Sequence, residues 1–193
     1  VEGDAPCAEL GELVHRLDRD TSGCLMLARK RAALKSLHGS MLAQKVEKQY
    51  LALLRGRWPK GRNTINAPLQ KRTVASGERV VRADSSGKPA VTHYQIEESF
   101  AEATLMRVTL ETGRTHQIRV HSQLAGHPIA GDSKYGDELF NNQLRELGLG
   151  RMFLHACSVR LRHPVSGESL TIEAPLPAPL EKLLVRLRSG ESL

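Results

Sequence analysis

The chain has 193 residues, of which 40% are hydrophobic and 25% charged, a composition typical of a globular protein with a sizeable core. Only 4% are aromatic, which argues against RNA binding through an extended stacking platform. The 28 lysines and arginines outnumber the 21 aspartates and glutamates. The resulting net charge of +7 suits a polyanionic partner, but basic charge alone fits an ordinary soluble protein equally well.

Cysteine usage and hydropathy indicate the compartment. Cys7, Cys24 and Cys157 show no CxxC spacing, which is typical of reduced thiols in the cytoplasm. No apolar run approaches the ~18 residues of a membrane-spanning helix. No signal peptide is visible either. We therefore expect a cytoplasmic protein without membrane contact.

The N-terminal part predicts a loop, a turn, a strand and a helix in succession. Residues 1–12 carry Gly, Pro and acidic residues and predict a loop, and a polar turn over 18–23 follows. The apolar run 24–30 predicts a buried strand, and residues 31–45 predict an amphipathic helix. The expected apolar face of that helix consists of Ala33, Leu34, Leu37, Met41 and Leu42.

The central part is dominated by strand patterns. Residues 46–56 alternate and are bounded by Gly56, which predicts a strand. Short strand candidates separated by Ser/Gly turns follow within 64–92. The segments 92–100 and 101–112 predict two adjacent antiparallel strands.

A short helix is predicted for residues 116–125, after a strand break at Gly113. Thr115 is its expected N-cap and Gly126 its expected C-cap. The first turn of this helix should face whatever lies at the end of the preceding strand.

The C-terminal part predicts two more strands, over 153–164 and 169–175, and an amphipathic helix over 180–188. No internal repeat or low-complexity segment is present. Runs of strands in hairpin order with inserted helices predict an α+β fold whose sheet is largely antiparallel.

The segment HRLDRDTSG, residues 15–23, places two arginines, one histidine and two aspartates in one turn. On composition alone, a solvated turn capped by Asp20 or Thr21 is the favoured interpretation. If the segment were extended, Asp18 and Asp20 would face the same side, and a glycosidase with paired carboxylates would be an alternative.

The segment TGRTHQIRVH, residues 112–121, offers a second polar cluster. On a helix, Gln117 shares a face with His121, and His116 shares one with Arg119. A basic helix N-terminus that follows a glycine turn can approach a phosphate. The two histidines also suggest zinc, but their HxxxxH spacing differs from HExxH and no Cys or Glu lies close. We expect no metal here.

A metal-dependent phosphatase is a further alternative for the first segment. Asp18, Asp20 and Thr21 resemble the DxDx[TV] start of haloacid-dehalogenase-type phosphatases, and Asp132 begins a later GDxxxxD pattern. Such enzymes place the first aspartate at the tip of a buried parallel strand. Half of residues 14–17 are charged or polar, and the alternation of strands and helices is absent.

Taken together, these segments resemble the RluA/RluC branch of the pseudouridine synthases. HRLDRDTSG matches the family motif HRLDxxTSG at every specified position. Further matches follow in the expected order at KQYLAL (48–53), LETGRTHQIRVH (110–121), GHPIAGDSKYG (126–136) and FLHA (153–156). The resemblance spans most of the chain and is closest to bacterial enzymes that modify large-subunit ribosomal RNA.

The resemblance implies the pseudouridine synthase fold, with a mixed, mostly antiparallel sheet flanked by helices and loops. It also implies the isomerisation of specific uridines in 23S ribosomal RNA, a reaction that needs no cofactor and no metal. Ribosomal RNA is then the expected partner, and we expect a monomer. A basic RNA-binding module without catalysis is the main alternative.

The resemblance is incomplete at the N-terminus. Family members usually carry a KPxG-bearing strand before HRLD, and many have an S4-like RNA-binding domain, but neither is found ahead of His15. We therefore expect residues 1–193 to form a catalytic domain alone.

The resemblance also implies roles for five residues. Asp18 falls on the catalytic aspartate, which acts either on the base or at the ribose. Arg119 falls on the active-site arginine and would keep that carboxylate ionised. Tyr50 would stack on the target uracil, and Leu154 would close the other side and exclude water. Arg16 would occupy the space that the flipped base leaves.

The remaining residues of the motif have weaker implied roles. His15 either orients the turn or contacts the substrate. Thr21, Ser22 and Gly23 would shape the turn that presents Asp18. The family motif leaves the position of Asp20 unspecified, which implies a structural or solvent-facing acid.

Overall fold

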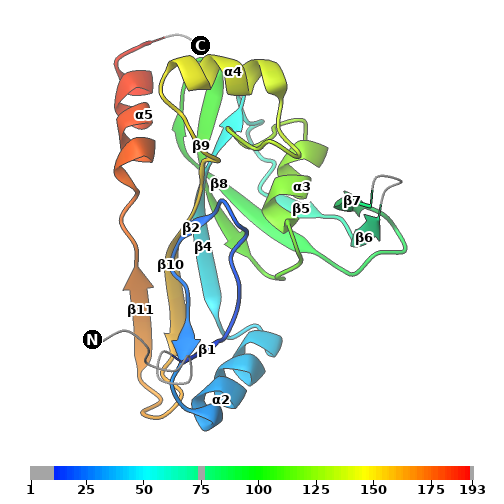
Figure 1. Ribbon diagram of the computed structural model, residues 1–193, viewed down its shortest axis with the longest axis vertical. Coiled ribbons are helices and arrows are strands. Elements are labelled where there is room, and N and C mark those ends of the chain that lie inside the picture. Colours follow the sequence, from blue (N-terminus) through cyan, green and yellow to red (C-terminus); the bar gives the residue numbers. More distant parts are fainter. Residues whose placement is uncertain (1–10, 74–76, 192–193) are drawn as a thin grey trace, which may run out of the picture.

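The computed structural model describes residues 11–73 and 77–191. Most of the loop expected over 1–12 lies outside the described residues, as does Cys7. A seven-stranded sheet runs through the molecule, with helices at both of its ends and one helix beside it (Figure 1). Among the described residues, no helix has the length and apolar character that crossing a membrane requires.

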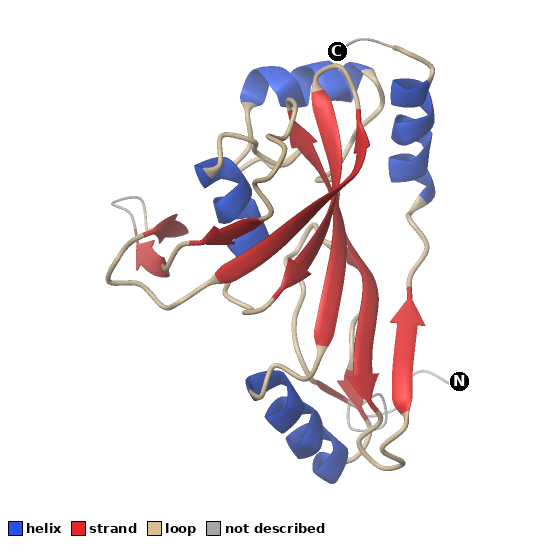
Figure 2. Cartoon of the chain, turned by 180° about the vertical axis from the view of Figure 1, so that it is seen from behind, coloured by secondary structure: helices blue, strands red, loops and turns tan. Residues whose placement is uncertain are grey.

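The sheet has the strand order β11-β10-β4-β9-β8-β5, and each of these neighbours is antiparallel to the next. These strands are β4 (Glu47–Arg55), β5 (Thr64–Asn66), β8 (Val91–Ser99), β9 (Ala103–Leu110), β10 (Leu154–Arg162) and β11 (Ser169–Glu173). The sheet is strongly twisted, so its long strands cross in the view of Figure 2. The predicted α+β class and the mostly antiparallel sheet are confirmed.

Shorter strands lie around this sheet. The first and third, β1 (Glu12–Leu13) and β3 (Leu27–Ala28), pair with each other, and β2 (Ser22–Gly23) adds to β10 in parallel. The strands β6 (Leu69–Thr73) and β7 (Arg79–Ala83) form a separate hairpin that projects beside helix α3 (Figure 1).

The described residues contain four helices, which are α2 (Arg31–Leu42), α3 (Gln117–Leu124), α4 (Glu138–Glu146) and α5 (Ala178–Arg188). No helix is predicted above for the stretch that contains α4. Its start nevertheless carries a helix signal, because the Asp137 side chain accepts a hydrogen bond from the Phe140 amide at 2.8 Å. Phe140 and Leu144 on α4 then pack with the leucines of α5 in one buried cluster.

Alternation along β4 divides the core between the two faces of the sheet. Leu53 is fully buried in the cluster beneath α4 and α5. Tyr50, Ala52 and Leu54 point to the opposite face, where they pack in a second cluster that includes Ile118 of α3. This second face carries the side chains that the sequence singles out.

Two expectations near the N-terminus are wrong in detail. The buried strand expected over 24–30 is reduced to β3, and Leu25 and Leu27 are 42% and 49% exposed. Only the alternate side chains Met26 and Ala28 are buried, because β3 lies at the periphery and turns one face to the core. The predicted helix over 31–45 ends at Leu42, which is exposed rather than part of the apolar face.

The parallel contact between β2 and β10 depends on Gly23. This glycine has φ +112°, and a Cβ there would lie 2.1 Å from the carbonyl oxygen of Ala156. Any larger residue would suffer both a strained backbone and a clash with a strand. The contact therefore requires glycine at this position.

We expect Gly23→Ala to lower the free energy of unfolding by at least about 2 kcal/mol, measured by urea denaturation. Gly39→Ala is the matched control, because Gly39 lies within α2 and a Cβ there would meet nothing within 4 Å. That control should raise stability by about 0.5–1 kcal/mol. Equal stability of the two variants would contradict the assignment of Gly23 as the anchor of β2.

Candidate active site

A cavity of about 270 Å³ opens on the sheet face that carries α3. Its lining includes all five residues to which the family resemblance assigns roles, which are Arg16, Asp18, Tyr50, Arg119 and Leu154. They come from the N-terminal segment, β4, α3 and β10, so only the folded chain brings them together.

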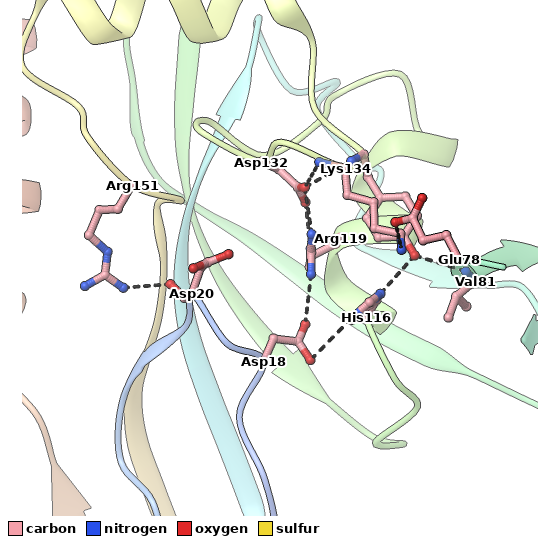
Figure 3. A network of polar contacts seen from close by, with 10 residues as sticks. Asp18, Asp20, Glu78, Val81, His116, Arg119, Asp132, Lys134 and Arg151 are labelled. Carbon is pink, nitrogen blue, oxygen red and sulfur yellow. Dashed lines mark hydrogen bonds and ion pairs between the residues drawn. The ribbon is translucent and has the colours of Figure 1, made fainter. Parts of the chain in front are cut away.

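Asp18 lies at the start of a turn that is fixed by backbone contacts. Its carbonyl oxygen accepts a hydrogen bond from the Thr21 amide at 3.0 Å. Directly afterwards, Ser22 and Gly23 pair with β10. Arg151 donates to the carbonyl oxygen of Asp20 at 2.8 Å from the other side (Figure 3). The turn is therefore held at both its middle and its end.

A buried histidine adds a side-chain anchor to the same turn. His155 of β10 is 2% exposed, and its Nε2 lies 3.0 Å from the carbonyl oxygen of Ala174, which can only accept. The His155 Nε2 must therefore donate, and its Nδ1 accepts from the Ser22 hydroxyl at 2.9 Å. This explains why the motif carries a serine after the turn.

His15 serves the fold of the turn and also lines the cavity. Its Nε2 accepts a hydrogen bond from the Met26 amide at 3.1 Å, which ties the segment before Asp18 to the segment after it. Burial, and then the positive charge of Lys48, lowers the pKa of His15. The neutral imidazole that this hydrogen bond requires is thus favoured.

Asp20 does not share the cavity with Asp18. Residues 18–21 form a turn rather than an extended strand, and Asp20 is exposed and lines a different cavity together with Arg19. The extended segment that a paired-carboxylate glycosidase would need is therefore absent from this part of the structure.

Arg119 makes its strongest contact with Asp132. Its Nε and Nη2 donate to the two carboxylate oxygens at 2.7 and 2.8 Å, and the side chains are only 8% and 0% exposed. One of those oxygens also accepts from the amides of Lys134 and Tyr135. Burial alone would raise the pKa of Asp132, but these hydrogen bonds outweigh it and the pKa is lowered. The carboxylate is therefore ionised and fully partnered.

The predicted pairing of Asp18 with Arg119 is present at longer range. Arg119 Nη1 lies 3.6 Å from Asp18 Oδ2, and His116 Nε2 lies 3.9 Å from Asp18 Oδ1 (Figure 3). These are ion-pair distances rather than hydrogen bonds. The sequence indicates Arg119 as a site residue, but it indicates Asp132 only as a possible metal ligand. The structure shows that Asp132 orients Arg119.

That metal-ligand role does not fit the observed contacts. The carboxylate of Asp132 is occupied by Arg119. Residues 14–17, which precede Asp18, form no strand, because β1 ends at Leu13. The buried parallel strand that a DxD-type phosphatase needs before its first aspartate is thus not formed here.

Two largely buried side chains, Tyr50 and Leu154, line the same cavity as Asp18. Tyr50 and Leu154 are 7% and 3% exposed and belong to the same core cluster, on the neighbouring strands β4 and β10. Burial, followed by the negative charge of Asp18, raises the pKa of Tyr50, so its phenol stays protonated. Arg16, by contrast, is exposed at the edge of the cavity.

The start of α3 differs from the prediction. The cap residue is His116 rather than Thr115, and it has φ 54°, in the left-handed region. The Gln117 side-chain oxygen accepts from the Arg114 amide at 2.9 Å and from the Thr112 hydroxyl at 2.8 Å. No side chain caps α3, and Gln117 instead fixes the loop that precedes the helix. At the other end, the cap is Ala125, and Gly126 follows it with φ 83°.

The two histidines of this segment have separate partners. His121 is fully buried and contacts Thr92 Oγ1 at 2.8 Å and the carbonyl oxygen of Ala67 at 2.9 Å. His116 instead contacts Tyr135 and faces Asp18. His121 therefore fastens α3 to β8, whereas His116 belongs to the cavity.

The chain is similar to curated bacterial pseudouridine synthases. It is 54% identical over 187 residues to the ribosomal large subunit pseudouridine synthase C of Pasteurella multocida, covering 97% of this chain and 57% of that protein. It is 52% identical over 187 residues to the protein of the same name from Escherichia coli K12, covering 96% of this chain and 59% of that protein. The chain thus spans less than two thirds of these relatives.

Solved structures give the same result. Human RNA Pseudouridylate Synthase Domain Containing 1 matches with a TM-score of 0.73 and 30% identity, covering 92% of this chain and 80% of that one. Human RNA Pseudouridylate Synthase Domain Containing 4 matches with a TM-score of 0.75 and 28% identity, covering 91% and 75%. Residues 9–124 also match the profile described as RNA pseudouridylate synthase. The chain belongs to the RNA pseudouridylate synthase family.

Proposed function

We propose that this chain is a catalytic domain, residues 1–193, that isomerises uridines of large-subunit ribosomal RNA to pseudouridine in the cytoplasm. The observation that carries the proposal is the position of Asp18, in a small cavity beside a buried guanidinium and with the apolar side chains of Tyr50 and Leu154 in the same lining. The names of the bacterial relatives support ribosomal RNA of the large subunit as the substrate class.

The reaction moves one bond and one proton. The N1–C1′ bond of uridine breaks, the uracil turns, a C5–C1′ bond forms, and the proton leaves C5 while N1 gains one. No electron is gained or lost, so the residues of the cavity need to supply only a carboxylate, orientation and exclusion of water. Asp18 supplies the carboxylate, acting either on the base or at the ribose.

Arg119 orients Asp18. Its guanidinium lies 3.6 Å from one oxygen of Asp18 and attracts the carboxylate toward it. Because Asp132 already binds Arg119 through two hydrogen bonds, the guanidinium stays in place when a base enters the cavity. Asp18 therefore meets the substrate as a charged group of fixed orientation.

Tyr50 and Leu154 supply the walls for the uracil. The protonated phenol of Tyr50 offers a ring face for stacking, and Leu154 on the adjacent strand limits the space opposite. Together they exclude water that would otherwise trap a cleaved intermediate. Arg16, exposed at the edge of the cavity, is positioned to fill the gap that the flipped base leaves in the RNA.

We expect Asp18→Asn to abolish tritium release from C5-labelled ribosomal RNA, because the amide carries no charge and cannot serve as the nucleophile. Asp20→Asn is the matched control. It removes an exposed carboxylate two positions away and should keep the wild-type rate. Equal release by Asp18→Asn and wild type would remove Asp18 from the mechanism. RNA binding without any release by the wild-type chain would favour a binding module instead.

We expect Asp132→Asn to lower the free energy of unfolding by about 3–5 kcal/mol and to abolish turnover, because it leaves the buried charge of Arg119 uncompensated. The double variant Arg119→Met with Asp132→Asn should recover most of the stability in urea denaturation, since both charges are then gone and the asparagine oxygen still accepts from the amides of Lys134 and Tyr135. It should nevertheless remain inactive. Turnover by the stable double variant would contradict the role of Arg119.

The same ion pair should make stability depend on pH. Because the pKa of Asp132 in the folded chain is lowered from 3.8, its contribution is complete above that value and is lost as the pH falls further. The pH dependence of the free energy of unfolding should therefore differ most between wild type and the Arg119→Met, Asp132→Asn variant in this acidic range. The wild type should lose stability faster on acidification. Parallel pH profiles would contradict a lowered pKa for Asp132.

A further inference from the structure

The hydroxyl of Tyr135 links the β6–β7 hairpin to the proposed active site. The Val81 amide of β7 lies 3.0 Å from the Tyr135 oxygen, and His116 Nδ1 lies 2.9 Å from it (Figure 3). On the far side of the imidazole, Nε2 faces Asp18 Oδ1 at 3.9 Å. A chain of polar groups thus runs from the hairpin backbone to the carboxylate.

The direction of each hydrogen bond in this network follows from the groups at its two ends, the Val81 amide and the Asp18 carboxylate. The Val81 amide can only donate, so the Tyr135 oxygen accepts from it. The Asp18 carboxylate can only accept and faces Nε2, so the neutral imidazole carries its proton on Nε2, and Nδ1 accepts the one phenolic proton. The Nε2–H is therefore aimed at Asp18.

The burial of His116 favours the neutral imidazole. Partial burial, the largest effect, lowers the pKa of His116. Asp18 from the N-terminal segment and Asp132 from the loop before α4 raise the pKa, whereas Arg119 of α3 and Lys134 of the same loop lower it. The net direction is downward, so His116 is mostly uncharged near neutral pH.

The backbone at His116 is also held in an unusual conformation. Its φ of 54° is uncommon for a residue other than glycine, and such conformations persist where surrounding contacts impose them. The Tyr135 ring meets the imidazole edge-on, with 5.5 Å between the ring centres. The tyrosine thus fixes His116 by both packing and a hydrogen bond.

We propose that Tyr135 is a positioning residue for the reaction, which fixes the Nε2–H tautomer of His116 and ties its aim at Asp18 to the β6–β7 hairpin. This inference rests on the proposed function, because it takes Asp18 as the reacting carboxylate. Arg119 faces Oδ2 and His116 faces Oδ1, so the carboxylate is oriented from two sides.

The distance of 3.9 Å between His116 Nε2 and Asp18 Oδ1 is too long for a hydrogen bond in the free protein. Catalytic hydrogen bonds are often long in the free enzyme and shorten when the substrate binds. Because the Tyr135 hydroxyl contacts both Val81 and His116, the position of His116 relative to Asp18 depends on the position of the hairpin backbone.

Tyr135→Phe tests this inference, because it removes the hydroxyl and keeps the ring that packs on His116 and lies 5.0 Å from the guanidinium carbon of Arg119. Nitrogen-15 NMR of the histidine side chains in the whole chain should show the Nε2–H tautomer for His116 in the wild type. The variant should lose that preference. This measurement needs no substrate.

Turnover of labelled ribosomal RNA gives the second readout for Tyr135→Phe. We expect kcat to fall by about tenfold with KM unchanged within about twofold, because the hydroxyl orients the carboxylate without touching RNA. Loss of the hydrogen bond to the neutral imidazole raises the pKa of His116. The acid side of the rate profile should therefore move to higher pH in the variant.

Tyr94→Phe is the matched control. It also removes a buried tyrosine hydroxyl beside α3, bonded to Ser122 at 3.1 Å, but this hydroxyl has no link to Asp18. Its pH profile and kcat should stay at wild-type values, while its stability falls as in Tyr135→Phe. His116→Asn, which tolerates a positive φ, should lose about as much rate as Tyr135→Phe, and the double variant should lose no more.

Two outcomes would overturn the inference while leaving the proposed function intact. One is an Nδ1–H tautomer of His116 in the wild type. The other is a wild-type kcat and pH profile in Tyr135→Phe while Asp18→Asn is inactive. Activity in Asp18→Asn would instead overturn the proposed function, and the NMR measurement separates the two cases because it is independent of turnover.

Discussion

The geometry of the site depends on one interaction, the buried pair of hydrogen bonds between Arg119 and Asp132. The same carboxylate receives the amides of Lys134 and Tyr135, so it fixes the loop before α4 as well as the guanidinium. Both groups that face Asp18 are thus connected to Asp132. Arg119 faces one oxygen of Asp18 at ion-pair distance, and Tyr135, whose amide donates to Asp132, contacts the His116 that faces the other oxygen.

Such a pair is a costly way to stabilise a fold. Burying two charges carries a desolvation penalty that their attraction offsets only when every polar atom is satisfied. Asp132 meets that condition, because three separate groups donate to its two oxygens. The arrangement is better understood as a means of orientation. It holds a cation rigidly beside Asp18 while leaving one nitrogen of Arg119 directed at the cavity.

The sequence predicts the long strands and the residues of the cavity well, because alternation and family motifs are local signals. It fails where tertiary contacts decide. Thr115 is the natural cap for α3 by residue type, yet the helix begins one residue later, at a His116 whose side chain makes no capping hydrogen bond. Leu42 follows the helical period but lies past the edge of the core. The pairing of Asp132 with Arg119 joins two segments whose proximity no periodicity encodes.

The short strand β2 has a consequence for the order in which the molecule is assembled. It is the parallel addition to an otherwise antiparallel sheet, and Ser22 pairs with His155, 133 positions later in the chain. Closing so long a loop costs conformational entropy before the contact stabilises anything. During synthesis the turn that bears Asp18 emerges well before β10 does. The turn therefore gains this support only once β10 has been made.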